Sequence, residues 1–488
     1  MMRCVCRRAV GIVVVCITMQ MPVAVFAQDD KAMVLAQIES RATRYGEIAQ
    51  EIWDLAELGY LEEQSSALLQ STLAQAGFTL DVGVADIPTA FVASFGNGRP
   101  VVAILAEFDA LPGITQARVP VRQPLTDSES GHACGHHLFG TGSTAAAIAV
   151  KEWLQATNTP GTIRLYGTPA EEGGSGKVYM VRAGLFDDVD VVLHWHPGDR
   201  NGAGVYSTLA IESVKFRFHG VSAHAAAAPH LARSALDGVE AMNVMVNMMR
   251  EHVPQETRIH YVITGGGAAP NVTPDFAEVY YYLRHPDSDE VQHIFERVVK
   301  AAEGAALGTG TTVDYELTGG TYALLPNEVL ARAMQANLEQ VGGVEYDAAE
   351  REFAETLRAT LPKNSPPPEA AAQVDPFVVI PGAIPASTDV GDVSWVVPTV
   401  GLSAATWVPG TSAHTWQAIA AGGMSIGNKG MLVAAKTIAL TAVDLFTNKE
   451  LIASAREEYQ RRVGPDFEYV PLLGNRAPPL DYRKRPGS

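Results

Sequence analysis

The sequence feature that most constrains the fold is an unbroken apolar run at residues 101–105, which ends at Glu107-Phe108-Asp109. A strand whose side chains are apolar on both faces is typical of the interior of a parallel sheet covered by helices on both sides. Strand-like segments recur at 162–166 and 189–196, and a stretch of small and apolar residues suited to a helix lies at 140–154. The pattern predicts an α/β domain, in which ligands usually bind beyond the carboxyl ends of the strands.

A different pattern begins near Ile211. Residues 214–218 alternate polar and apolar side chains, as a half-exposed strand does, and 234–253 carry apolar residues at helical spacing. Three further strand-like segments and one helical segment follow, at 258–264, 277–284, 312–317 and 287–302. The resulting order β-α-β-β-α-β predicts a small α+β domain of the ferredoxin-like type, inserted into the α/β domain.

The N-terminus has the layout of a secretory signal peptide. Arg3, Arg7 and Arg8 precede an apolar run at 9–19, and a small residue, Ala27, offers a cleavage site. The alternative is a membrane anchor, but the run is short for a span of about 20 residues. No later apolar run is predicted to span a bilayer. We therefore expect a secreted, periplasmic protein that is soluble after cleavage.

Cleavage would change both the cysteine content and the charge. It would remove Cys4, Cys6 and Cys16 and leave only Cys134, so no intramolecular disulfide could form. It would also remove three arginines and no acidic residue, which takes the net charge from −18 to −21. This acidic balance argues against a nucleic-acid or membrane-surface binder, because both need a positive field.

The segments are predicted to divide the chain as follows: 1–27 signal peptide, 28–209 first part of the α/β domain, 210–325 inserted domain, 326–450 second part of the α/β domain, and 451–488 C-terminal helix and tail.

Five polar clusters lie at predicted strand ends or in loops, at 107–109, 131–137, 169–174, 194–198 and 413–415. Cys134 and His136 are two residues apart, so in an extended stretch they point the same way and could hold one metal ion. The adjacent Glu171 and Glu172 could take different tasks, one as a ligand and one as a base. Each cluster alone has a structural explanation, in packing or in a solvated loop. Their coincidence near strand ends favours one shared site.

These clusters resemble the motifs of the peptidase M20 family of metal-dependent amidohydrolases, in the branch of aminobenzoyl-glutamate, N-acyl-amino-acid and auxin-conjugate hydrolases. The matching stretches are 106–113, 131–140, 169–174, 222–229, 270–275 and 387–416. The resemblance implies a bilobed fold. Its catalytic domain would have a mixed sheet with helices on both faces, and the inserted domain would serve as a lid and dimerisation domain.

The resemblance also implies a site for two divalent metal ions. Its ligands would be Cys134, His136, Glu172, His196 and His414. Glu171 would be the general base. His194 remains an alternative to His196 because both point to the same face of a strand. The sequence departs from the family at His137, where relatives often carry Asp or Asn.

Three residues of the inserted domain have counterparts in the family. The resemblance implies that His224 reaches the active site of the other protomer in a homodimer and supports the oxyanion. It implies that Asn271 and Arg284 hold a carboxylate of the substrate, a task that suits the forked guanidinium. The structural alternatives are a loop histidine for His224 and a surface strand cation for Arg284.

One thiolate, one carboxylate and three imidazoles suit zinc or manganese. We expect an enzyme that cleaves the amide bond of N-acyl amino acids or small conjugates carrying a carboxylate. A dipeptidase or carboxypeptidase would use the same site. Two further alternatives are a metal-free binding or scaffold protein, and an enzyme in which Cys134 is a nucleophile.

Overall fold

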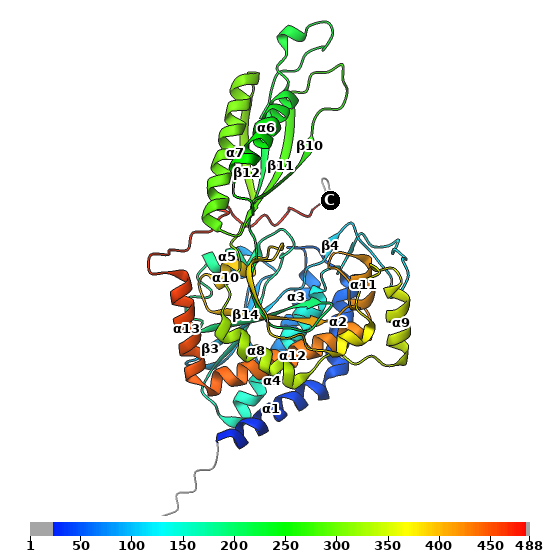
Figure 1. Cartoon of the computed structure of the whole chain (residues 1–488), viewed down its shortest axis with the longest axis vertical. Coiled ribbons are helices and arrows are strands. Elements are labelled where there is room, and N and C mark those ends of the chain that lie inside the picture. Colours follow the sequence, from blue (N-terminus) through cyan, green and yellow to red (C-terminus); the bar gives the residue numbers. More distant parts are fainter. Residues whose placement is uncertain (1–22, 485–488) are drawn as a thin grey trace, which may run out of the picture.

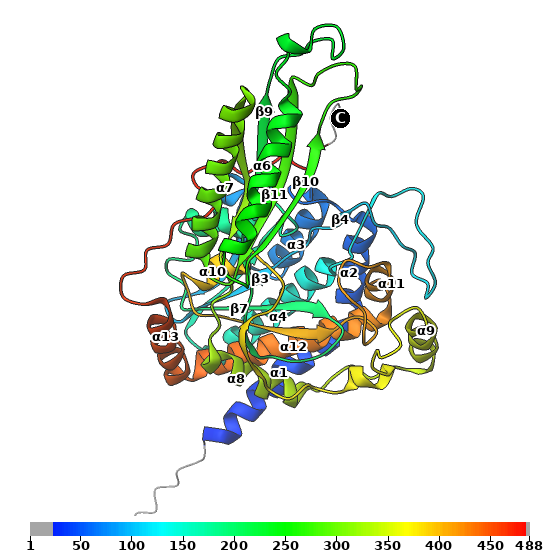
Figure 2. The ribbon, with the colours of Figure 1, turned by 45° about the horizontal axis from the view of Figure 1, so that its top comes forward.

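The structure is a computed structural model that describes residues 23–484. Most of the predicted signal peptide, residues 1–22, lies outside the described residues. Its last residues and the predicted cleavage site fall at the start of helix α1 (Val23–Ser40). Figures 1 and 2 show two lobes, a large one in which the described chain begins and a smaller one built from its middle.

The large lobe contains a six-stranded mixed sheet of order β1-β2-β6-β3-β7-β14. Its strands are β1 (Thr79–Val82), β2 (Phe91–Asn97), β3 (Val101–Ala106), β6 (Gly161–Gly167), β7 (Val191–Gly198) and β14 (Thr399–Ala405). The last four are mutually parallel, and β1 and β2 run antiparallel at one edge. All six residues of β3 are buried between β6 and β7, as its unbroken apolar run predicted.

Helices cover both sides of this sheet, which confirms the predicted fold class. On one side lie α1, α2 (Ala42–Leu55), α3 (Glu63–Gln75), α4 (His136–Thr157), α8 (Glu328–Val341) and α12 (Ser425–Thr447). On the other side lie the short helices α5 (Gly176–Arg182) and α10 (Val390–Ser394), which contact each other (Figures 1 and 2).

Helix α12 corrects one sequence prediction. In the part of the chain that the structure describes, it is the single helix long and apolar enough to cross a membrane by length and composition. The sequence was expected to hold no such run after the signal peptide. However, 78% of its most apolar window is buried, and it packs against α4, α8 and α1. The apolar character of α12 is thus explained by its place in the core.

The small lobe is a four-stranded antiparallel sheet of order β10-β11-β9-β12, with two helices on one face. Its elements are β9 (Ala210–His219), α6 (Ala235–Met249), β10 (Arg258–Gly265), β11 (Phe276–His285), α7 (Ser288–Thr309) and β12 (Thr312–Thr321). They follow the predicted order β-α-β-β-α-β. A separate hydrophobic core, which includes Phe216, Val239 and Val298, joins the sheet to the helices. We call this lobe the lid domain.

The remaining elements belong to the large lobe. They are α9 (Ala348–Arg358), α11 (Trp416–Gly422), α13 (Lys449–Val463) and two small sheets, β4 (Leu111–Pro112) with β5 (Ser130–Gly131) and β8 (Val205–Ser207) with β13 (Val379–Ala383). Between the end of α13 and residue 484 the structure contains no helix or strand. Residues 464–484, which we call the C-terminal segment, run back past the base of the lid domain (Figure 1).

Candidate metal centre

The polar clusters predicted from the sequence meet at one end of the main sheet. They come from the carboxyl ends of β3, β6 and β7, from the start of α4 and from the loop after β14: Glu107, Asp109, Cys134, His136, Glu171, Glu172, His196 and His414. The loop of His414 is tied to that of Cys134, because the His414 N–H donates to the carbonyl of Ala133 over 2.9 Å. The parallel arrangement of the strands is what brings these distant segments together.

The side chains form three overlapping groups, in each of which the potential ligand atoms all lie within 4.8 Å of one another. The groups are Cys134, His136 and His196; Cys134, Glu172 and His414; and Glu107, His136 and Glu171. Cys134 and His136 each belong to two groups. The structure therefore brings together all five predicted ligands and the predicted base.

Several of these atoms face each other at short distance. Nε2 of His136 lies 3.1 Å from Oε2 of Glu107, and Nε2 of His414 lies 3.1 Å from Oε1 of Glu172. The His136, Glu107 and Glu172 atoms are buried and have no hydrogen-bond partner. Buried polar atoms are normally paired, so atoms that converge unpaired fit the coordination of a cation. The thiol, carboxylate and imidazole donors suit a divalent transition metal.

Asp109 supports two of the candidate ligands from behind. Its Oδ1 atom lies 2.8 Å from Nδ1 of His136, and its Oδ2 atom accepts a hydrogen bond from the Glu172 N–H over 2.9 Å. Burial alone would raise the pKa of Asp109, but the charge and hydrogen bond of His136 and the N–H of Glu172 hold it below its ordinary value. Asp109 is thus held as a carboxylate that orients both ligands.

Burial raises the pKa of the Glu171 carboxyl well above its ordinary value, and the nearby Glu107 and Glu172 carboxylates raise it further. A carboxylate that binds a proton more readily is suited to accept one and return it. Burial and the charge of Glu172 also raise the pKa of the Cys134 thiol. A free thiol there would stay protonated, which does not favour the nucleophile alternative.

Sequence reasoning missed two charged residues at the site, Lys177 and Asp389. The ammonium of Lys177 lies 2.7 Å from Oε1 of Glu107 and 2.7 Å from Oδ1 of Asp389, and all three side chains are buried. Nothing in the spacing around Lys177 marks it as part of a site. Asp389 lies within the stretch 387–416 that matched the family motifs, which was the available signal.

The structure separates His196 from the alternative ligand His194. His196 places Nε2 at 3.4 Å from the Cys134 sulfur. The ring of His194 packs on Gly401 of β14 so closely that a Cβ there would come within 2.3 Å of it. Burial lowers the pKa of both rings, to about 3 for His194 and to about 4 for His196, so charge does not distinguish them. The geometry favours His196 as the ligand.

His137, the departure from the family pattern, points elsewhere. Its Nε2 atom lies 3.1 Å from the carbonyl of Gly422, and its ring centre lies 4.8 Å from that of His132. Burial lowers the pKa of His137 well below its ordinary value. His137 therefore acts as a neutral packing residue, and Asp109 supplies the support behind His136.

Two of the three predicted residues of the lid domain, His224 and Asn271, lie away from the candidate metal ligands of their own chain, which we call the metal cluster (Figure 1). His224 and Asn271 lie on neighbouring loops, which the bond from the Ala225 N–H to the Asn271 carbonyl joins over 3.1 Å. These loops lie at the end of the lid domain farthest from the main sheet (Figure 1). Arg284 lies on β11 with its guanidinium 5.7 Å from the ring centre of Tyr282, and its Nε atom is buried without a partner.

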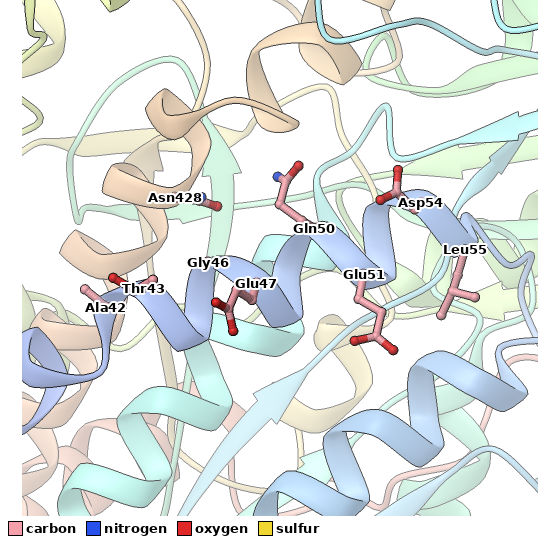
Figure 3. Close-up of a pocket in the computed structure, with 9 residues that line it drawn as sticks. All are labelled: Ala42, Thr43, Gly46, Glu47, Gln50, Glu51, Asp54, Leu55 and Asn428. Atoms are coloured by element: carbon pink, nitrogen blue, oxygen red, sulfur yellow. The ribbon is translucent and has the colours of Figure 1, made fainter.

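The described residues also line cavities outside the metal cluster. One, of about 610 Å³, lies between the two loops of the lid domain that carry His224 and Asn271, and Ala225 is among the residues that line it. Another, of about 720 Å³, runs along α2 (Figure 3). It is lined by Ala42, Thr43, Gly46, Glu47, Gln50, Glu51, Asp54, Leu55 and Asn428. Neither cavity contains a candidate ligand.

Comparison with known proteins agrees with the motifs. Residues 103–366 match the family described as Peptidase family M20/M25/M40. The B subunit of the p-aminobenzoyl-glutamate hydrolase of Escherichia coli (strain K12) is 43% identical, over 90% of this chain and 97% of that protein. The Xaa-Arg dipeptidase of Homo sapiens is 30% identical, over 87% of this chain and 91% of that protein.

Solved structures share the fold. An aminobenzoyl-glutamate utilization protein from Klebsiella pneumoniae superposes with a TM-score of 0.57 at 19% identity, over 83% of this chain and 97% of that one. A dinuclear metal-binding peptidase of the M20 family from Bacillus subtilis gives 0.56 at 17% identity, over 84% and 99%. The chain therefore belongs to peptidase family M20/M25/M40, as its motifs predicted, and is a hydrolase of amide bonds.

Proposed function

We propose that the protein hydrolyses the amide bond of N-acyl amino acids or small amino-acid conjugates, aminobenzoyl-glutamate among them, at a site for two divalent metal ions. The observation that carries the proposal is the convergence of three overlapping donor groups on Cys134 and His136, with Glu171 beside them. Similarity to the p-aminobenzoyl-glutamate hydrolase of Escherichia coli and to a hippurate hydrolase of Campylobacter jejuni supports the substrate class.

The donors divide naturally between two ions. Cys134 and His136 bridge the groups, His196 completes one, and Glu172 with His414 completes another. Zinc and manganese both suit this mixture of sulfur, nitrogen and oxygen atoms. When bound, such ions polarise the carbonyl of the substrate and make a water molecule acidic near neutral pH.

The protein's own groups carry the proton. The Glu171 carboxylate accepts a proton from the attacking water, whose oxygen forms a bond to the amide carbon. The carbon–nitrogen bond then breaks, and Glu171 returns the proton to the leaving amine nitrogen. Asp109 keeps the His136 ring in one tautomer by accepting from Nδ1. Lys177 balances the charge of Glu107 beside Glu171.

The lid domain would bind the carboxylate of the substrate. Arg284 offers a half-buried guanidinium with an unpaired Nε atom, in a chain of strongly acidic composition. His224 and Asn271 lie on loops remote from the metal cluster of their own chain, so a homodimer would let them complete the site of a partner. The relative from Escherichia coli is named as a B subunit, and the A subunit named for the same hydrolase is 31% identical over 52% of this chain. The alternative to a homodimer is a complex with a different chain, one that is similar to that A subunit.

We also propose that the protein is exported to the periplasm. The N-terminal layout of arginines, apolar run and small residue supports this location. A mature chain with Cys134 as its single thiol suits an oxidising compartment, because no second thiol is left to form an intramolecular disulfide and a bound metal would occupy the Cys134 sulfur. Detection of a mature N-terminus at Gln28 in a periplasmic fraction would test it, and retention of residues 1–27 would contradict it.

A dipeptidase is the second candidate function. It is favoured by 30% identity to mouse and human Xaa-Arg dipeptidases over most of the chain. The deciding experiment is a hydrolysis screen of aminobenzoyl-glutamate, N-acyl amino acids and dipeptides, with Zn²⁺ and Mn²⁺ supplied separately. Preference for dipeptides would replace the first proposal.

A variant without the general base shows whether the measured hydrolysis comes from this protein or from a contaminating hydrolase. Glu171→Gln should keep the metal content of the wild type and lose turnover by about 10²- to 10⁴-fold, the usual contribution of a general base. Unchanged turnover would remove Glu171 from this role. A protein that binds neither metal and cleaves none of the compounds would support a scaffold function instead.

A further inference from the structure

We propose that the C-terminal segment is part of the active site, and that Arg483 and Tyr482 are positioning residues for the loop that carries Glu171 and Glu172. The inference rests on the proposed function of that loop. It starts from an observation that the sequence motifs do not contain. The Glu172 carbonyl accepts hydrogen bonds from Nη2 of Arg483 over 2.6 Å and from the hydroxyl of Tyr482 over 3.2 Å.

Three side chains from elsewhere in the chain hydrogen-bond to the backbone of the loop at residues 169–174. Glu62 accepts from the Ala170 N–H over 2.9 Å, and Tyr60 donates to the Gly174 carbonyl over 2.7 Å. Asp109 accepts from the Glu172 N–H over 2.9 Å. Ala170 has a φ of 59°, a left-handed conformation that surrounding contacts must enforce. The C-terminal segment supplies two further hydrogen bonds to this loop, both at the Glu172 carbonyl.

The position of Tyr482 is itself closely defined. Its ring packs edge-on against Tyr60 with 5.6 Å between ring centres, and the Arg483 guanidinium lies 4.7 Å from the ring centre of Tyr482. A Cβ at Gly59 would come within 2.4 Å of the Tyr482 hydroxyl oxygen, so a glycine there leaves the room that the tyrosine needs. The segment is thus built into the structure beside the loop.

Earlier contacts anchor the segment on its way to the site. The Tyr469 hydroxyl donates to Asp392 over 2.7 Å, and Arg182 donates to the carbonyls of Gly474 and Arg476 over 3.0 and 2.8 Å. Arg476 reaches Glu316 of the lid strand β12 at 3.1 Å. The segment therefore runs from the base of the lid domain to the loop, and residues 472 and 473 are buried along the way.

The chemical consequence concerns the direction of the Glu172 side chain. A guanidinium that donates to a carbonyl forms a charge-assisted hydrogen bond, which fixes the plane of the peptide bond after Glu172. Loss of this bond would let the peptide rotate and would loosen a candidate ligand together with the base next to it. Contacts of this kind, behind the ligands of a metal, typically contribute 10- to 100-fold to metal affinity or activity.

The experiment uses the full chain with Arg483→Ala, Arg483→Lys and Tyr482→Phe. Lys484→Ala is the matched control, because Lys484 is the exposed cation next to Arg483. For each variant one measures the Zn²⁺ dissociation constant by competition with a chromophoric chelator, the absorption spectrum of bound Co²⁺, kcat, KM and the Tm of the metal-free protein.

We expect Arg483→Ala to weaken Zn²⁺ binding or to lower kcat by roughly 10- to 100-fold, with a changed Co²⁺ spectrum and an unchanged KM. Arg483→Lys should recover part of the loss, since an ammonium can still donate to the carbonyl, and Tyr482→Phe should lose less. Wild-type binding and kcat in Arg483→Ala, a lowered Tm alone, or an equal loss in Lys484→Ala would overturn the proposal. The Zn²⁺ and Co²⁺ measurements need no substrate, so they decide this inference even if no tested amide is cleaved. If Arg483→Ala does not fold, the lysine and phenylalanine variants decide in its place.

Discussion

The Oδ1 atom of Asp109 accepts a hydrogen bond from Nδ1 of His136 over 2.8 Å. When His136 serves as a metal ligand, it is neutral, and donation from Nδ1 leaves its lone pair on Nε2, the atom that faces Glu107 and the metal cluster. The second oxygen of Asp109 accepts from the Glu172 N–H. One carboxylate thus sets the direction of two candidate ligands that are 36 residues apart in the chain.

We predict that Asp109→Asn weakens metal binding or activity by about 10- to 100-fold, the usual effect of losing a partner behind a metal ligand. An amide cannot accept with both of its heavy atoms, so either His136 or Glu172 loses its partner. The metal content after dialysis and the Zn²⁺ dissociation constant check the prediction. The exposed Asp187→Asn serves as the control for loss of one negative charge. Wild-type metal retention in Asp109→Asn would contradict it.

The part of the site that could be predicted from the sequence consists of residues whose functional partners are close in the chain. The close spacing within the pairs Cys134 and His136, and Glu171 and Glu172, indicated a shared site. The apolar run of β3 likewise predicted a buried strand. Periodicity does not say which strands are neighbours, and the order β6-β3-β7 that gathers the clusters came from the structure.

The residues that sequence reasoning missed have distant partners. Lys177 pairs with Asp389, 212 positions away, and Arg483 reaches the Glu172 carbonyl across 311 positions. A lone lysine after a glycine-rich loop and a basic residue in a Pro-rich tail carry no local pattern. His194 and His196 could not be separated for a related reason. Alternation gives both the same face, and they differ only in three-dimensional contacts, with Gly401 for His194 and with the Cys134 sulfur for His196.

Lys177→Met should destabilise the protein by about 3–5 kcal/mol, because removal of one partner leaves the buried Glu107 and Asp389 carboxylates without their cation. The free energy of unfolding from urea titration of the metal-free protein is the measurement. Lys436→Met removes the half-buried partner of the exposed Glu39 and should change stability by at most about 1 kcal/mol. Equal losses of stability in the two variants would show that burial does not make the ion pairs of Lys177 contribute more to stability than the pair of Lys436 does.

Cys134→Ala separates the metal-ligand role from the nucleophile role. Because the sulfur atom belongs to two of the three donor groups, its loss should lower the number of metal ions bound per chain. Elemental analysis of the purified variant gives that number. Full metal loading with lost activity would instead favour a nucleophilic thiol.

Glu212 on β9 should make stability depend on pH. Burial raises the pKa of its carboxyl to about 8, from an ordinary value of 4.5, and its Oε2 atom has no hydrogen-bond partner. Between these two values the folded protein keeps the proton that the unfolded chain loses, so stability falls as pH rises through this window. Glu212→Gln removes the titration. Relative to the wild type it should gain about 1.4 kcal/mol for each pH unit within the window and level off above it.

Urea titrations from pH 4 to pH 9 test this slope. The exposed Glu240→Gln on α6 of the same domain is the control and should show no such trend. A stability difference between Glu212→Gln and the wild type that stays constant across the range would mean that the Glu212 carboxyl is ionised in the folded protein.

His224 and Glu171 test whether the site is shared between protomers. Each of His224→Ala and Glu171→Gln should be nearly inactive alone. In a mixed homodimer, the chain that retains Glu171 would receive His224 from its partner, so one site would be intact. Equal mixing should therefore restore about one quarter of wild-type turnover, because half of the dimers are mixed and each holds one good site of two. Native mass spectrometry with one isotope-labelled variant verifies exchange. If exchange is complete and turnover stays at the level of the single variants, His224 does not act across a dimer. It could then reach the metal cluster only by a movement of the lid domain of its own chain toward the main sheet.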